Sequence, residues 1–229
     1  MVRLLKEFIE LLFELILILV YFPVGFVNGL YLQFITPLLK KDKGTIVLVE
    51  RWFHSHILHN KWKRYLEKQG FRVYMINFPI YKGGFSDSAF SLKTFIDAQN
   101  LRDITLVGIS SGGLTSYLYL QDHDGWKRVK QFISVGTPFG GTYTILPLFF
   151  LKSARELFPS SSFINTLQKN PLLDPKKVTC LSAKFDGLIP TQHCFLPGAE
   201  NITIDVYGHN NLHLRCRQTY DIIVSKAVA

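Results

Sequence analysis

A serine stands between glycines where an apolar run of the sequence ends. The segment Gly108-Ile109-Ser110-Ser111-Gly112 follows the strand predicted at residues 104–107 and precedes apolar residues with helical spacing. Glycines leave out the Cβ atoms that would collide in a tight strand-to-helix turn. A serine in such a turn projects its hydroxyl above the sheet, at the positive end of a helix dipole. The pattern predicts that Ser110 is a nucleophile. The alternative is a glycine-rich turn in which the serine is incidental.

A serine hydroxyl becomes a useful nucleophile only beside a base that a carboxylate orients. Asp186 comes directly after the strand predicted at 178–183, and His209 directly after the strand predicted at 202–206. The carboxyl ends of parallel strands meet at one edge of a sheet, where Ser110 is also expected. His213 is a rival base, but it falls inside the helix predicted at 212–228. We therefore predict a catalytic triad of Ser110, Asp186 and His209.

Strands and helices that could position these residues alternate along the chain after Gly44. Residues 45–49 are β-branched or apolar without polar alternation, which is typical of a strand buried on both faces. Further strands are predicted at 72–77, 104–107, 132–135, 178–183 and 202–206, with helices around 58–66, 87–97, 114–118 and 212–228. Six strands separated by helix-length intervals predict a mostly parallel sheet with flanking helices, the α/β class.

Several sequence blocks beyond the serine turn support a more specific interpretation. Residues 135–142 read VGTPFGGT, residues 157–163 read LFPSSSF with Leu167 following, and residues 196–201 read LPGAEN. From Thr45 onward the chain resembles the small, nearly lidless bacterial lipases of the α/β-hydrolase superfamily, which carry GTPHGGT, L-x-P-G-S-x-F-x-x-L and LPGA-x-N at the corresponding places. The resemblance implies an α/β-hydrolase fold, a Ser110-Asp186-His209 triad, ester hydrolysis through an acyl-enzyme, and no cofactor.

The loop after the first predicted strand departs from this resemblance. Such lipases have His-Gly there, and the loop donates one N–H to the oxyanion hole, whereas this chain has Glu50-Arg51-Trp52. Losing one such donor costs roughly 100-fold in rate. We expect backbone N–H groups of Ser111 and Trp52 to form the hole. Arg51 should keep a negative φ and point outward, pairing with Glu50 or another surface acid.

The N-terminal segment has a different character from the rest of the chain. No charged residue occurs from Leu15 to Leu39, although Pro23, Gly25 and Pro37 interrupt the run. Ahead of it, charged residues at three- and four-residue steps predict an amphipathic helix. We expect residues 1–43 to be a helical membrane-associated segment, as a kinked span or an interfacial hairpin. The alternative is a helix buried against the domain formed by residues 44–229. Basic residues flank both ends, so the sidedness stays open.

Composition limits the other function classes. The chain has 229 residues, 48% hydrophobic and 19% charged, which excludes a disordered chain and fits one buried domain. The net charge of +9 comes with no nucleic-acid motif, so it is assigned to membrane headgroups or solvated helix faces. His54, His56 and His59 have nearly the spacing of a zinc site, but Leu58 stands where the aspartate ligand would be. No metal is expected, and the oligomeric state is left open.

These observations predict a serine carboxylic-ester hydrolase, lipase- or esterase-like, that acts at a membrane on a lipid or a small apolar ester. The apolar residues 143–151 could line an acyl groove or belong to the core. Two alternatives remain open. One is a non-catalytic membrane-tethered scaffold whose oxyanion loop has decayed at Glu50-Arg51. The other is an acyltransferase or thioesterase that uses the same triad.

Overall fold

The computed structural model describes residues 5, 7–9, 12–13, 16, 33–35, 43–50, 56–78, 83–170 and 173–228. Strands and helices alternate within this part of the chain. The strands are β1 (Gln33–Ile35), β2 (Thr45–Val49), β3 (Arg72–Asn77), β4 (Ile104–Ile109), β5 (Val129–Val135), β6 (Val178–Phe185) and β7 (Glu200–Tyr207). The helices are α2 (His56–Lys68), α3 (Phe85–Ala98), α4 (Ser111–Asp122), α5 (Lys152–Glu156), α6 (Ser162–Lys169), α7 (His209–Leu214) and α8 (Arg217–Val228). Short 3₁₀ turns are η1 (Gly125–Lys127), η2 (Leu146–Leu148), η3 (Pro175–Lys177) and η4 (Thr191–Cys194).

The described strands form one sheet in the order β1-β3-β2-β4-β5-β6-β7. The six strands from β2 to β7 run parallel to one another, and β1 pairs antiparallel with β3 at one edge. This arrangement confirms the predicted, mostly parallel α/β sheet. The strand order reverses between β2 and β4, so the carboxyl ends of these strands border a crevice where ligands bind in open α/β sheets.

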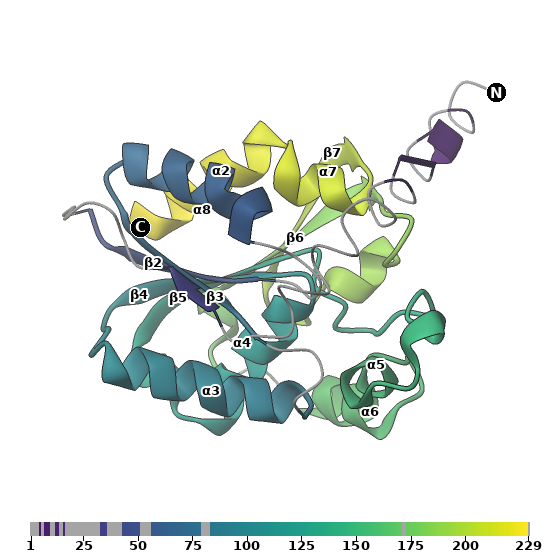
Figure 1. Ribbon diagram of the computed structural model, residues 1–229, viewed down its shortest axis with the longest axis horizontal. Coiled ribbons are helices and arrows are strands. Elements are labelled where there is room, and N and C mark those ends of the chain that lie inside the picture. Colours follow the sequence, from purple (N-terminus) through teal and green to yellow (C-terminus); the bar gives the residue numbers. More distant parts are fainter. Residues whose placement is uncertain are drawn as a thin grey trace.

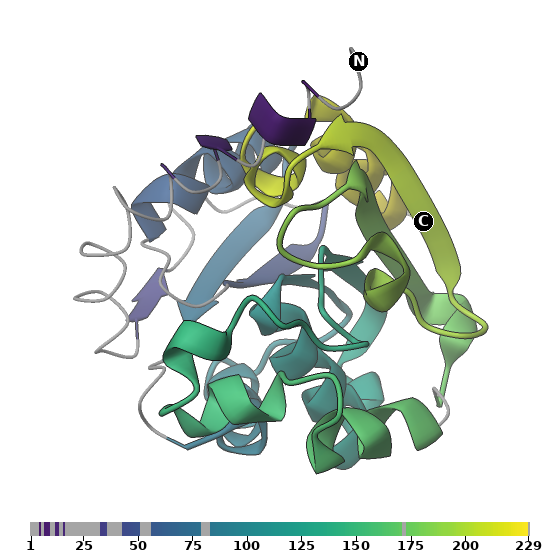
Figure 2. The same ribbon diagram turned by 90° about the vertical axis from the view of Figure 1, so that its right-hand side faces the viewer.

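Helices cover both faces of the sheet, as Figure 1 shows. Helices α2, α7 and α8 lie on one face, and α3 and α4 lie on the other with α5 and α6 beside them. Figure 2 shows the same layers after a quarter turn, with the strands between them. Each face has its own apolar core, one around Phe85, Leu92 and Phe132, the other around Trp62, Phe71 and Tyr220.

The central elements of the fold, β2, β4 and α4, are buried along almost their whole length. All five residues of β2 and all six of β4 are buried, which matches their lack of polar alternation. Residues 111–120 of α4 are buried as well, so this helix is covered all round and not only on one side. Ser110, between β4 and α4, is therefore held at both ends by fully packed elements.

The predicted final helix at 212–228 is wrong in one respect, because two helices occupy this region. Helix α7 ends at Leu214, and α8 begins at Arg217. The carbonyl oxygens freed at the break accept hydrogen bonds from side chains: Trp62 Nε1 donates to His213, Thr219 Oγ1 to Leu212 at 2.7 Å, and the Tyr220 hydroxyl to Leu214 at 2.8 Å. Side chains thus replace the missing helical partners, which lets the chain turn there.

The N-terminal segment, expected to be helical within residues 1–43, also contains a short strand. Residues Gln33–Ile35 form strand β1, whose partners on β3 are Asn77, Ile76 and Met75. The described positions among residues 5–16 are helical. Most of the uncharged run at 15–39 lies outside the described residues. No helix in the described part of the chain has both the length and the apolar character needed to cross a membrane.

Candidate active site

Ser110 occupies a strained turn between β4 and α4. Its backbone angles are φ 51° and ψ −124°, and a positive φ is unusual for a residue with a Cβ atom. Two main-chain hydrogen bonds hold this conformation. The Ser110 N–H donates to Val135 O at 2.8 Å, and the Gly113 N–H donates to Ser110 O at 2.9 Å. Strain of this kind persists only where the surroundings impose it, as they do at functional sites.

Two of the glycines in the turn are required by close backbone approach. A Cβ atom at Gly108 would lie 2.4 Å from the Cα atom of Gly113. A Cβ atom at Gly112 would lie 2.3 Å from the Val49 carbonyl oxygen and 2.7 Å from that of Glu50. The start of α4 therefore packs directly on the end of β2. The glycines that the sequence pattern singled out are explained by these contacts.

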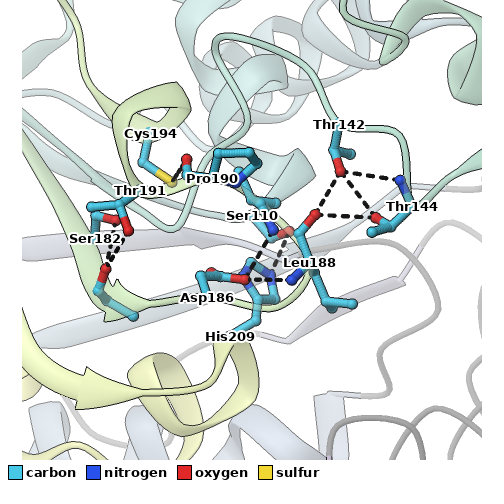
Figure 3. Close-up of polar contacts among 12 residues, drawn as sticks. Ser110, Thr142, Thr144, Ser182, Asp186, Leu188, Pro190, Thr191, Cys194 and His209 are labelled. Atoms are coloured by element: carbon cyan, nitrogen blue, oxygen red, sulfur yellow. Dashed lines mark hydrogen bonds and ion pairs between the residues drawn. The ribbon is translucent and has the colours of Figure 1, made fainter. Parts of the chain in front are cut away.

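The structure brings the three predicted triad residues together, as Figure 3 shows. Ser110 Oγ lies 3.0 Å from His209 Nε2, and His209 Nδ1 lies 2.6 Å from Asp186 Oδ2. Ser110 and Asp186 are each 9% exposed and His209 is 1% exposed. The distances fit a serine hydroxyl that donates to Nε2 while the Nδ1–H donates to the carboxylate. The imidazole can then accept the serine proton, and the nearby carboxylate favours the imidazolium that forms.

The Asp186 carboxylate is held by the loop that follows it. Its other oxygen, Oδ1, accepts hydrogen bonds from the backbone N–H groups of Leu188 at 2.9 Å and Ile189 at 3.0 Å. The Leu188 carbonyl oxygen in turn accepts from the hydroxyls of Thr142 and Thr144. This loop is thereby tied to the segment that enters the apolar stretch 143–151. The block VGTPFGGT ends at Thr142, but no sequence pattern predicted that Thr142 and Thr144 would bind the loop after Asp186.

His209 is placed by its position at the first residue of α7. Gly208 precedes it with φ 98°, and the Gly208 N–H donates to Phe185 O at 2.8 Å, beside Asp186. The rival base His213 lies one turn further along α7, and its ring packs edge-on against that of His209 with centroids 5.1 Å apart. His209 is thus the histidine that is hydrogen-bonded to Ser110. The catalytic roles of the three residues stay a prediction.

The loop after β2 is expected to supply one oxyanion N–H, and the described residues include only its first residue, Glu50. Ser111 is the first residue of α4 and is 5% exposed, at the helix end where N–H groups favour negative charge. Arg51 and Trp52 lie outside the described residues. The expectation that Glu50 is a surface acid available to Arg51 is wrong. Glu50 is 3% exposed, and its carboxylate Oε1 lies 2.7 Å from His59 Nδ1 in the interior.

The contact between Glu50 and His59 also involves one of the three histidines that have nearly the spacing of a zinc site. His59 is fully buried beside Glu50, and the side chains of His54 and His56 lie outside the described set. Within the described residues, no group of three or more His, Cys, Asp or Glu side chains is placed to hold a metal ion. Histidines at a predicted helix start are expected to be solvated or to cap the helix, and for His59 this expectation is wrong, because its ring is fully buried beside Glu50.

The apolar stretch at 143–151 is divided between core and surface. Ile145 is buried, but Tyr143, Leu146, Phe149 and Phe150 are between 43% and 72% exposed. The Arg155 guanidinium donates to the carbonyl oxygens of Phe149 and Phe150, at 3.2 and 3.0 Å, and so fixes their main chain. Neither sequence alternative, a groove lining or a core element, describes the whole stretch. An exposed apolar cluster of this kind often marks an interaction site.

Comparisons with known proteins agree with the fold. A family model described as alpha/beta hydrolase fold matches residues 44–161. The mature lipase BlEst2 of Bacillus licheniformis is 18% identical over 88% of this chain and 99% of its own, with a TM-score of 0.71. The esterase EaEST of Exiguobacterium antarcticum is 16% identical over 87% and 95%, with a TM-score of 0.65. A bromoperoxidase of Bacillus anthracis is 14% identical over 85% and 94%, also at 0.65.

A search of curated protein sequences finds no match. Likeness to solved structures at such low identity establishes the fold, and the varied activities named for the three proteins agree with the rule that one fold hosts several chemistries. The family match covers the elements from β2 through the serine turn and beyond β5. The resemblance of the sequence to the α/β-hydrolase superfamily is confirmed: the chain belongs to the alpha/beta hydrolase fold family.

Proposed function

We propose that this protein is a serine carboxylic-ester hydrolase that forms an acyl-enzyme on Ser110. The observation that carries the proposal is the continuous hydrogen-bonded chain from Ser110 Oγ through both ring nitrogens of His209 to Asp186. A nucleophile, a base and an orienting acid in this geometry are what acyl transfer requires. The strained serine turn at the carboxyl end of β4 supports the same proposal, because it presents Ser110 in that chain.

The reaction follows from the positions of these atoms. His209 Nε2 takes the Ser110 hydroxyl proton while Oγ bonds to the ester carbonyl carbon, and negative charge develops on the carbonyl oxygen beside the start of α4. The C–O bond to the alcohol then breaks, and the imidazolium gives its proton to the leaving oxygen. Water enters, His209 removes its proton, and the same steps in reverse order release the carboxylic acid and restore Ser110.

The substrate we propose is an ester with an apolar acyl chain at a lipid surface, with the N-terminal segment attaching the protein to that surface. Helical positions there expose Leu5, Phe8, Ile9, Leu12 and Ile16, each between 48% and 62%. The Arg215 guanidinium lies 4.4 Å from the Phe13 ring centroid, so this helix adjoins the C-terminal end of α7, the helix that begins with His209. In Figure 1 this helix lies at the upper right, beyond α7, whereas α5 lies at the lower right.

A fluorophosphonate probe tests the catalytic part of the proposal, because it reacts only with an activated serine. We expect the full chain to be labelled and to hydrolyse p-nitrophenyl butyrate, and we expect Ser110→Ala to lose both properties. Ser91→Ala is the matched control, since the Ser91 hydroxyl donates only to the backbone of its own helix at Asp87 O. A folded parent protein that is neither labelled nor active would contradict the proposal and favour a scaffold.

The proposed preference for apolar esters at a lipid surface is tested by comparing a long-chain substrate with a short-chain one. We expect Phe149→Ser with Phe150→Ser to lower the ratio of p-nitrophenyl dodecanoate turnover in lipid vesicles to p-nitrophenyl butyrate turnover in solution. Phe90→Ser is the control, because Phe90 is 61% exposed on α3, outside the stretch at 143–151. An unchanged ratio in the double variant would contradict the proposed lipid surface without affecting the triad.

A further inference from the structure

A buried group of titratable side chains lies behind the active site, on the face of the sheet that α2 and α7 cover. It consists of Glu50 directly after β2, His59 on α2 and His213 on α7, which are 3%, 0% and 0% exposed. Glu50 Oε1 and His59 Nδ1 are 2.7 Å apart, with side chains only 1% and 0% exposed. A buried carboxylate is costly unless it is paired, so this contact fixes both side chains firmly.

Glu50 is also bound through its main chain. Its N–H donates to Ile76 O at 2.9 Å, which holds it against β3. A Cβ atom added to Gly112 would lie 2.7 Å from the Glu50 carbonyl oxygen, so the Glu50 main chain packs directly on the turn that presents Ser110. Glu50 thereby fixes the point from which the oxyanion loop departs. Trp52, the residue expected to donate the second oxyanion N–H, follows two positions later.

His59 reaches the catalytic base from the other side. Its ring centroid is 5.7 Å from that of His213, and the His213 ring lies edge-on to His209 with the two planes at 84°. Trp62, almost one turn after His59 on α2, donates its indole N–H to the His213 carbonyl oxygen. Helix α2 therefore contacts α7 at two places beside the base, while it holds Glu50 through His59.

We propose that the Glu50–His59 hydrogen bond is the positioning device of this active site, setting the departure point of the oxyanion loop and supporting His209 through His213. The inference rests on the proposed ester hydrolysis. Neither residue touches the reacting atoms, so both are positioning residues. Oxyanion donors act because they are fixed before charge develops, and a displacement of about 1 Å can cost roughly 100-fold in rate.

The proposal predicts a change in kcat and not in KM. With p-nitrophenyl butyrate, we expect Glu50→Ala to lower kcat about 10- to 100-fold and to leave KM within about twofold, because transition-state contacts are lost and ground-state contacts are kept. Glu50→Gln should recover kcat to within about threefold, since its amide oxygen can still accept from His59 Nδ1–H. The rate of fluorophosphonate labelling should follow kcat across the series.

Glu67→Ala is the matched control. Glu67 accepts from Lys63 Nζ at 2.6 Å, a second buried pair on the same helix, with side chains 6% and 1% exposed. We expect both Glu50→Ala and Glu67→Ala to lower the melting temperature, and only Glu50→Ala to lower kcat of the folded protein. If Glu50→Ala does not fold, Glu50→Leu with His59→Leu removes the pair without leaving a buried charge alone. That double variant should fold and show the same loss of kcat.

The outcomes separate this inference from the function on which it rests. If the parent protein neither hydrolyses the ester nor reacts with the probe, the proposed function fails. If the parent is active and Glu50→Ala or the double leucine variant keeps parental kcat, the positioning role alone is wrong. The same holds if Glu50→Ala and Glu67→Ala lose equal kcat, or if Glu50→Gln is as impaired as Glu50→Ala.

Discussion

The Nδ1 atom of His209 lies 2.6 Å from Oδ2 of Asp186, and their side chains are 1% and 0% exposed. Water is thereby kept from this hydrogen bond. Because an ionised carboxylate can only accept, Nδ1 is the ring nitrogen that carries the proton in this pairing. Nε2 is left as the acceptor that faces Ser110 at 3.0 Å. The backbone N–H groups of Leu188 and Ile189 prevent the carboxylate from turning away.

Asp186→Asn tests this relationship. An asparagine can keep the two backbone hydrogen bonds but presents an N–H to His209 Nδ1, which favours the tautomer that cannot accept the serine proton. We expect kcat to fall about 10³- to 10⁴-fold. The double variant Asp186→Asn with His209→Ala should be no slower than His209→Ala alone, because residues that act as a unit lose activity non-additively. Additive losses in ester turnover would show that Asp186 acts independently of the histidine.

Gly112→Ala tests the packing of the serine turn on β2. The new Cβ atom would meet the main-chain oxygens of Val49 and Glu50 at 2.3 and 2.7 Å, and neither can move without shifting the strand. We expect ester turnover to fall about 100-fold, because the turn and the oxyanion loop are displaced together, and we expect the melting temperature to fall.

Gly84→Ala is the control for this substitution. Its Cβ atom would meet the Glu156 carboxylate, which is the end of a flexible side chain. The loss of turnover should therefore be far smaller than for Gly112→Ala. Turnover near the parental level in Gly112→Ala would contradict the packing argument.

Two deletions separate membrane attachment from folding. Removal of residues 1–32 keeps β1, and we expect this protein to stop sedimenting with anionic lipid vesicles while it still hydrolyses p-nitrophenyl butyrate. Removal of residues 1–43 also deletes β1, which pairs with β3 at the sheet edge. We expect that protein to have a lower melting temperature. If the protein without residues 1–32 aggregates, these residues cover the domain. If it still binds vesicles, the membrane attachment lies elsewhere in the chain.

The contributions of Glu156 and Asp87 to the stability of the fold should depend on pH in opposite directions. Burial raises the pKa of the Glu156 carboxyl above its usual 4.5, although it accepts from the Phe85 N–H at 2.9 Å. The folded state therefore binds this proton more tightly than the unfolded state, and the contribution to stability is lost as pH rises through the folded-state pKa. We expect the urea midpoint of Glu156→Gln, relative to the parent, to increase between pH 4 and pH 8.

Asp87 is the internal control at the same helix end. The Gly84 N–H donates to its carboxylate at 2.7 Å and holds its pKa below the usual 3.8. The contribution of Asp87 to stability is present at pH values above its usual pKa, and it is lost as the pH falls through its folded-state pKa. We expect Asp87→Asn to be less stable than the parent at pH 7 and to approach it in acid. If the stability of both variants relative to the parent changed with pH in the same direction, the opposite pKa shifts of Glu156 and Asp87 would be contradicted.

The sequence by itself determined the parallel sheet and the three residues of the candidate triad. Buried parallel strands have uninterrupted apolar runs, and a serine turn demands glycines for reasons that operate within a few residues. Asp186 and His209 could be placed for the same reason, because the carboxyl ends of parallel strands meet at one edge whatever the details of packing. These features depend on local sequence and on topology alone.

Only the tertiary structure decided the features that depend on contacts between distant segments. Nothing near residue 215 signals the break between α7 and α8, because the side chain that caps His213 comes from Trp62 on α2. Glu50 reads as a surface acid in sequence, but α2 folds back over β2 and buries it beside His59. Strand β1 has only three residues and exists because β3 offers an unpaired edge. Side-chain hydrogen bonds across such separations require the assembled core, and no local pattern contains them.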